Sequence, residues 1–126
     1  TMLKVGIYNF KKLYNMENNK LIAEFMKLPT EVFNSGLLNY YHREYNSGTW
    51  YEEHELSYNV SWDWLMPVVE KCLTIDSRKR VINNELIACN TDEIYKMIIK
   101  NALITRNIDE VYKSVVELIK EYNKTI

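Results

Sequence analysis

The run Ser61-Trp-Asp-Trp-Leu-Met-Pro-Val-Val-Glu-Lys-Cys72 constrains the fold more than any other part of the chain. Ser61 or Asp63 can cap the exposed N–H groups of a first helical turn. Pro67 follows early enough to be tolerated, with some distortion of the helix. Apolar side chains recur at helical spacing at Trp62, Leu65, Met66, Val69 and Leu73. The run therefore predicts a helix over about residues 62–73 with one strongly apolar face.

The C-terminal segment predicts the clearest helix. Asn107 stands at a capping position, and Glu110 completes a capping box three residues later. Asp109 and Lys113 have the spacing of a favourable ion pair on one helix face. The helix carries a continuous apolar stripe, formed by Ile108, Val111, Tyr112, Val115, Val116, Ile119 and Tyr122. Together with residues 62–73, this stripe is expected to form the core.

The N-terminal third predicts a strand followed by a helix. Leu3, Val5 and Ile7 alternate with more polar residues, as in a short strand. Asn18 or Asn19 can then cap a helix that Pro29 ends. The apolar positions of this helix are Leu21, Ile22, Phe25 and Met26.

The middle of the chain predicts two hairpins and a further helix. Between residues 37 and 58, Asn46-Ser-Gly48 is a turn signal between aromatic runs, so a hairpin is expected there; a long aromatic loop is the alternative. Residues 80–82 and 85–89 flank Asn83-Asn84, which favours a tight hairpin. Asn90 and Glu93 form a capping box that leads into Ile94, Ile98 and Ala102. For residues 97–105 a strand stays open as an alternative.

Composition predicts one globular domain over residues 1–126. The chain is 47% hydrophobic and 26% charged, as is ordinary for a globular protein. Its net charge of -1 gives no general attraction to nucleic acid or to an anionic membrane, so neither is an expected partner. The pattern of elements predicts the α+β class: an α/β/α sandwich with a small antiparallel sheet and three to four helices.

Cellular location is predicted from two further features. Cys72 and Cys89 lie far apart and outside any metal-type cluster, which fits reduced, partly buried thiols. The sequence shows neither an apolar run long enough to span a membrane nor a signal peptide. We therefore expect a cytoplasmic protein.

Catalytic and metal-binding chemistry finds little support. His42 and His54 stand among carboxylates, so they are the candidates for a zinc site or for acid–base catalysis. Neither has helical ligand spacing, and Arg43 would repel a cation next to His42. The three glycines are isolated, which excludes a glycine-rich phosphate loop. We predict no catalytic residue, no metal and no cofactor.

Binding is the better-supported activity. Residues 40–55 mix aromatic and charged side chains, as interface hot spots do; the alternative is that the aromatics only cover a sheet. Asp63 between two tryptophans is a further candidate, although a helix cap explains it fully. A basic cluster at 78–80 could meet phosphate, or could simply be a solvated loop. The candidate binding residues are Tyr40, Tyr41, Trp50, Tyr51, Glu52, Glu53, Asp63, Arg78 and Arg80.

Three segments resemble one known family. They are Asn19-Lys-Leu-Ile-Ala-Glu-Phe-Met26, Ser61-Trp-Asp-Trp-Leu-Met-Pro-Val-Val-Glu-Lys71 and Tyr112-Lys-Ser-Val-Val-Glu-Leu-Ile-Lys-Glu-Tyr122. In this order they are similar to the small phage-encoded proteins of the phage ABA sandwich domain family. The resemblance spans about residues 19–123 and is weak between the central and last segments. It implies a phage origin, an α/β/α sandwich and no catalytic residues.

These observations together predict a non-enzymatic phage accessory protein that acts by binding in the infected bacterial cell. The first expected partner is a host protein, with a bacterial defence factor foremost. The alternative is sequestration of a small nucleotide-like signalling molecule, which would need a concave pocket, for example from Trp50, Tyr51 and residues 78–80. A cryptic enzyme using His42 or His54 is a third hypothesis. A homo-oligomer stays open.

Overall fold

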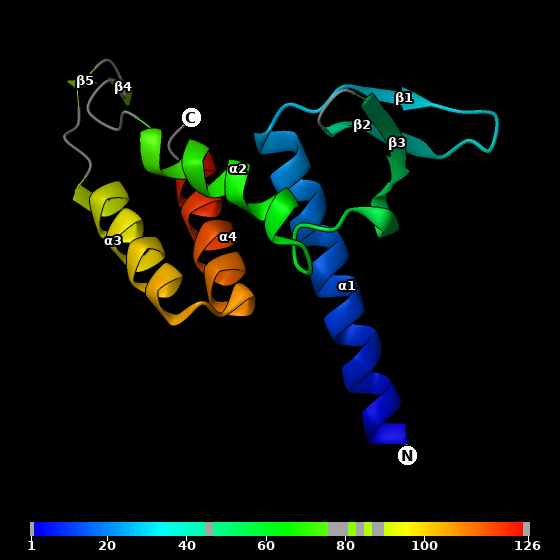
Figure 1. Ribbon diagram of the computed structural model, residues 1–126, viewed down its shortest axis with the longest axis horizontal. Coiled ribbons are helices and arrows are strands. Elements are labelled where there is room, and N and C mark those ends of the chain that lie inside the picture. Colours follow the sequence, from blue (N-terminus) through cyan, green and yellow to red (C-terminus); the bar gives the residue numbers. More distant parts are fainter. Residues whose placement is uncertain (1, 45–46, 76–80, 83–84, 87–89, 125–126) are drawn as a thin grey trace. The chain divides into compact units, whose positions relative to one another are not determined.

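A computed structural model describes residues 2–44, 47–75, 81–82, 85–86 and 90–124 of the chain (Figure 1). These residues contain four α-helices and a three-stranded antiparallel sheet, so the predicted α+β class is confirmed. The chain divides into two compact units, an N-terminal unit of residues 1–57 and a C-terminal unit of residues 58–126. The single domain expected from composition stays a prediction.

Helix α1, Met2–Phe25, occupies the first part of the N-terminal unit, so the predicted strand at residues 3–7 is wrong. The alternation covers only five residues, and extending an existing helix costs far less than nucleating a separate element. The predicted helix around Leu21, Ile22 and Phe25 is present, but Asn18 and Asn19 lie inside α1 rather than at its cap, and Met26 lies just beyond its end. The helix ends where Lys27 takes a positive φ of 56° and Leu28 N–H donates to Ala23 O at 3.1 Å.

The sheet of the N-terminal unit has the strand order β1-β2-β3. Its strands are β1, Thr30–Val32, β2, Leu38–Glu44, and β3, Ser47–Glu52. Strands β2 and β3 pair antiparallel, which confirms the predicted hairpin and excludes the long loop. The short 3-10 helix η1, Glu53–Glu55, follows β3. The buried side chain of Asn19 in α1 donates from Nδ2 to the backbone oxygen of Leu56, the residue after η1, at 2.9 Å. This hydrogen bond holds η1 against α1.

The C-terminal unit is helical, with helices α2, Trp62–Thr74, α3, Asn90–Thr105, and α4, Ile108–Lys124. Strands β4, Val81–Ile82, and β5, Glu85–Leu86, pair antiparallel, so the predicted second hairpin is confirmed in its described part. Helix α4 contacts both α2 and α3. Its predicted stripe is buried at Val111, Tyr112, Val115, Val116 and Ile119, and Leu118 adds to it.

Helix α2 has the predicted extent, but its buried face is shifted. Leu65 and Val69 are buried as expected, whereas Trp62 is 37% exposed and Met66 is 42% exposed. The side chains that take their place in the core are Trp64, Val68 and Cys72. Adjacent residues of a helix lie about 100° apart, so either of two overlapping stripes fits this apolar run. Ser61 occupies the N-cap position but makes no side-chain capping bond.

Helices α3 and α4 correct two local predictions. The strand alternative for residues 97–105 is excluded, and the buried positions of α3 are Ile99 and Ala102, with Ile94 and Ile98 exposed. Asn107 caps α4 as predicted, since its Oδ1 accepts from Asp109 N–H at 3.0 Å. The expected bond from Asn107 N–H to Glu110 is replaced by one to Thr105 Oγ1 at 3.2 Å.

Among the helices of the described residues, none has both the length and the apolar character that crossing a membrane requires.

Candidate functional site

The hairpin of β2 and β3 sorts its aromatic side chains onto two faces. Tyr41 pairs directly with Trp50, and Tyr40 pairs with Tyr51. Since side chains alternate along a strand and direct partners share a face, Tyr41 and Trp50 lie on one face of the sheet. Tyr40 and Tyr51 lie on the other. The sequence-predicted aromatic set is therefore divided, and Trp50 and Tyr51 do not line one common surface of the sheet.

Phe33, Tyr41 and Trp50 form what we call the aromatic cluster. The ring centroids of Phe33 and Trp50 are 5.2 Å apart, and those of Tyr41 and Trp50 are also 5.2 Å apart. Both are favourable tilted or edge-on contacts. Gly48 makes room for the cluster, because a Cβ there would lie 2.1 Å from the Tyr41 ring. The hairpin thus holds three aromatic rings together on one face.

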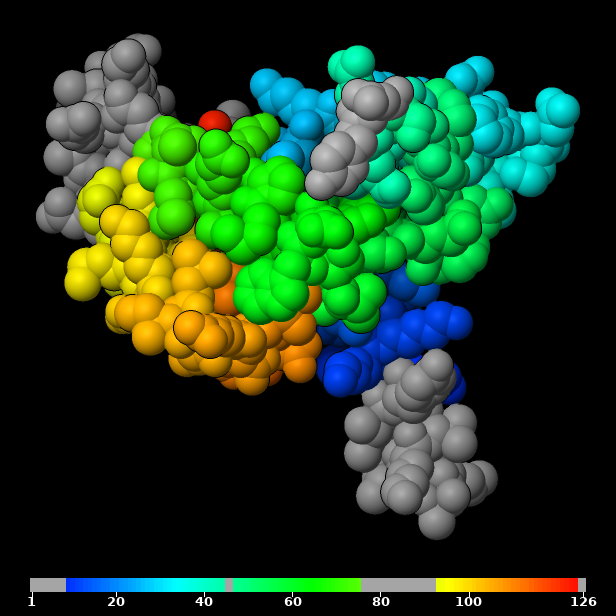
Figure 2. Space-filling model, viewed as in Figure 1, coloured from blue at the N-terminus to red at the C-terminus, as the bar shows by residue number. Residues whose placement is uncertain are grey.

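An apolar tip adjoins the aromatic cluster where β1 turns into β2. Val32 is 62% exposed, Phe33 39%, Leu37 52% and Leu38 40%. Phe33 N–H donates to Leu37 O at 3.3 Å, and Gly36 N–H donates to Phe33 O at 2.8 Å, so a tight turn holds Phe33 beside Leu37. Figure 2 shows β1 and the turn after it, in cyan, projecting at the margin of the N-terminal unit. Phe33 and Leu37 lie on the face of the aromatic cluster, whereas Val32 and its direct partner Leu38 lie on the opposite face.

The opposite face of the hairpin carries a polar group of three residues. Tyr51 O–H donates to Glu44 Oε1 at 2.8 Å, and His42 Nδ1 lies 3.5 Å from the same oxygen. The hydrogen bond to Glu44 raises the pKa of Tyr51. Burial lowers the pKa of His42, and Glu44 opposes this shift only in part. The His42 side chain is only 14% exposed. A neutral imidazole packed in the sheet is therefore enough to explain the lowered pKa of His42.

Tyr40 must be removed from the predicted binding set. Its side chain is 2% exposed and belongs to the core. Burial, with the charges of Glu53 and Glu24 next in size, raises its pKa. A partner cannot reach this ring without unfolding the sheet.

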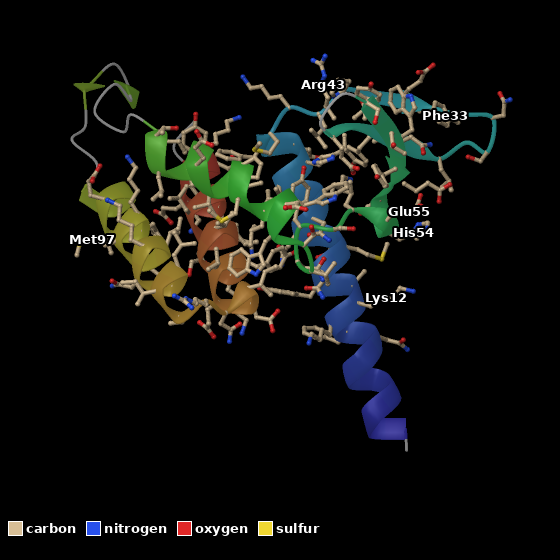
Figure 3. The ribbon with its side chains drawn as sticks, in the orientation of Figure 1. Lys12, Phe33, Arg43, His54, Glu55 and Met97 are labelled. Carbon is tan, nitrogen blue, oxygen red and sulfur yellow. The ribbon has the colours of Figure 1, made fainter. Side chains whose placement is uncertain are left out.

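Among the described residues, Glu52 at the end of β3 and His54 and Glu55 of η1 are the ones best placed to hold a cation. The ligand atoms of Glu52, His54 and Glu55 all lie within 4.8 Å of one another. His54 Nδ1 is 3.4 Å from Glu52 Oε2, while Glu55 Oε1 accepts from Glu52 N–H at 3.0 Å. Figure 3 shows His54 and Glu55 side by side at η1. All three residues lie within one exposed turn, so a local ion pair and a backbone cap explain the arrangement.

The remaining predicted residues do not join the aromatic cluster. Glu52 shares its face through the strand register, whereas Glu53 lies in η1. Asp63 lies exposed in the first turn of α2, where its negative charge interacts favourably with the positive end of the helix dipole. Arg78 and Arg80 fall outside the described residues, as does Cys89. Cys72 is buried, and burial raises the pKa of its thiol to about 12, so it is a core residue as predicted.

Sequence reasoning missed Phe33 and the apolar tip. Asn34-Ser-Gly36 is a turn signal of the same kind as Asn46-Ser-Gly48, and it places Phe33 and Leu37 at the two ends of a reverse turn. The signal was therefore present. Arg43 also lies on the face of the aromatic cluster, exposed and opposite Gly48 (Figure 3).

Comparison with known proteins brings no relative to this site: no family model matches the chain, and it matches no curated protein and no solved structure.

Proposed function

We propose that this chain is a binding protein whose contact surface consists of the aromatic cluster and the apolar tip. The observation that carries the proposal is the exposure of Phe33 and Leu37 on the face of Trp50, with Val32 and Leu38 exposed at the same end of the sheet on its other face. Exposed apolar side chains of this kind lower the solubility of a protein. Their presence together on a surface is therefore typical of an interaction site.

The partner fits a protein better than a small molecule. The cluster lies on a sheet face and at a turn, and its flanks carry the charged residues Glu31 and Arg43. Aromatic anchors with a polar rim are the usual composition of protein–protein hot spots. Because Trp50 and Tyr51 lie on opposite faces, the pocket expected for a nucleotide-like ligand lacks one of its two aromatic walls.

The resemblance to the phage ABA sandwich domain family supports a biological setting for this binding. In that setting the chain is a phage accessory protein that inhibits a host factor in the bacterial cytoplasm, with a defence protein as the first target. The proposal includes no catalytic step. The low exposure of His42 argues against this one histidine as a general base, because a general base must reach its substrate.

The test is capture of a partner from the lysate of a candidate bacterial host. Trp50→Ala should reduce capture of the specific partner by at least about tenfold, since truncating a hot-spot aromatic costs about 2 kcal/mol or more. Phe10→Ala is the matched control, because Phe10 is 73% exposed on α1 and lies outside both the aromatic cluster and the apolar tip. Thermal melting of each variant separates lost binding from lost folding.

Two results would contradict the proposal. One is equal capture by the wild type, Trp50→Ala and Phe10→Ala. The other is a nucleotide released from the denatured protein after purification from infected cells, with no protein captured, which would favour the small-molecule alternative.

A further inference from the structure

The outer edge of β3 carries backbone groups that no described strand uses. Tyr41 N–H donates to Pro29 O at 2.9 Å, so the backbone of Tyr41 faces β1 and away from β3. In an antiparallel pair, the direct partner of such a residue also turns its N–H and C=O away from the pair. The partner of Tyr41 is Trp50, and that of Arg43 is Gly48. The N–H and C=O groups of Gly48 and Trp50 therefore point outward from the sheet.

The described residues of β3 themselves carry little of the usual protection against edge pairing. Edge strands are commonly blocked by Pro, by Lys or by short length, as β1 is by its three residues and the preceding Pro29. Strand β3 has six residues, of which Glu52 alone is charged. Glu52 N–H is already occupied by Glu55 Oε1 at 3.0 Å, so the edge is closed at Glu52 and open at Gly48 and Trp50. The open stretch carries no charged residue.

We propose that the open edge of β3 pairs antiparallel with β3 of a second copy of this chain, around a two-fold axis at Thr49. In this register Gly48 of one copy lies opposite Trp50 of the other, and the reverse holds across the axis, as a two-fold interface requires. Both outward N–H groups and both outward C=O groups of each copy then find partners. The two three-stranded sheets become one continuous sheet.

Side chains on both faces fit this register. On one face, Trp50 of the second copy stands beside the Tyr41 ring that covers Gly48, so the two aromatic clusters join into one strip. Exposed Arg43 flanks the same row and can lie against that tryptophan. On the other face, Thr49 meets its own copy at the axis, and neither residue carries a charge that would oppose pairing. A second copy is therefore the occupant that this edge fits best.

The proposal goes beyond the proposed function, since it concerns self-association. Its test uses Thr49, which lies on the opposite face from Trp50 and outside the aromatic cluster. If the protein formed no dimer, the proposed binding of a partner through Trp50 would not be affected.

The first experiment measures mass in solution by light scattering at sub-millimolar concentration. Over a dilution series we expect the wild type to reach twice 15.1 kDa, and Thr49→Lys to reach that mass only at a concentration at least about tenfold higher, because two lysines face each other at the axis. Thr30→Lys, at an exposed threonine of the opposite sheet edge, is the control and should stay dimeric. A monomeric wild type would overturn the proposal, as would a dimer that Thr49→Lys leaves intact.

The second experiment tests the register with a cysteine. Thr49 and its copy form a non-hydrogen-bonded pair with Cα atoms about 4.5 Å apart, which falls within the range that a disulfide spans. Mild oxidation should link Thr49→Cys into covalent dimers at least about tenfold faster than Thr30→Cys or the wild type. Equal rates for the two variants would contradict this pairing, even if the protein were dimeric through another surface.

Discussion

At the scale of single residues, two tryptophans two positions apart have opposite roles. Trp64 is 7% exposed and stacks edge-on against Tyr58, with ring centroids 5.1 Å apart. Trp62 is 37% exposed at the first position of α2. The position within the helical turn, rather than the residue type, decides which indole enters the core.

Truncating these two residues should therefore have unequal effects. We expect Trp64→Ala to reduce the free energy of unfolding by about 3–5 kcal/mol, because it removes a buried aromatic side chain and its contact with Tyr58. Trp62→Ala should cost less than about 1 kcal/mol. Denaturant unfolding of both variants measures the difference, and equal losses would contradict the observed face of α2.

His42 should make the protein sensitive to mild acid. Burial lowers its pKa in the native state from the ordinary value of 6.5, so the unfolded chain binds more protons once pH falls below that value. Stability from this group is complete above about pH 6.5 and is lost as pH falls toward the native pKa. His42→Gln should flatten the loss of stability between about pH 7 and pH 5.

The comparison variant is His54→Gln, which removes an exposed histidine of η1 and leaves the buried one in place. Chemical denaturation at several pH values gives the slopes. If His42→Gln kept the full wild-type slope, the acid sensitivity would belong to other groups.

Residue roles could be predicted from the sequence only in part. Alternation alone separates Tyr40 from Tyr41 and Trp50 from Tyr51, but it does not say which face is buried. That choice depends on packing between elements, which local sequence does not contain. The core role of Cys72 was predictable from its apolar neighbours, whereas that of Trp64 was hidden by an equally apolar stripe one position away.

At the scale of elements, α4 shows what makes a segment predictable. Its apolar stripe is long and its N-terminus has a capping residue, so pattern and packing agree. Helix α1 shows the opposite case. Its first residues alternate over a length too short to distinguish helix from strand, and helix propagation from residues 18–25 decides the outcome.

Val115 tests the packing of α4. Its side chain is fully buried, so Val115→Asp places a carboxylate in the apolar core, where its desolvation is costly. We expect loss of cooperative unfolding, or a destabilisation of more than about 4 kcal/mol. Lys113→Asp is the control, since Lys113 is exposed on the same helix. A melting curve of Val115→Asp that matches the wild type would disprove the core assignment.

At the scale of the whole molecule, the groups that we assign to binding lie in the N-terminal unit, although α3 of the C-terminal unit also exposes Ile94, Met97 and Ile98. The aromatic cluster, the apolar tip, the edge of β3 and the trio Glu52, His54 and Glu55 all belong to residues 30–55. The C-terminal unit contributes a helical core. Sequence patterns predicted the part of this core that α4 supplies, but not the buried faces of α2 and α3, and the binding surface required the strand register.

Metal removal should leave stability unchanged. The trio at η1 comes from four consecutive positions, so a cation there would connect no distant elements. Treatment with a chelator is therefore expected to leave the melting temperature within error of the untreated protein. A fall of several degrees, restored by zinc, would show that a metal supports the fold.

The most direct test of the binding surface uses two neighbouring positions on opposite faces of β3. A photoreactive phenylalanine analogue replaces Trp50 in one variant and Tyr51 in another, and each is irradiated in host lysate. The position-50 variant should form a covalent adduct with a specific host protein, identified by mass spectrometry, and the position-51 variant should not. Adducts at position 51 alone, or equal adducts at both positions, would contradict the aromatic cluster as the contact surface.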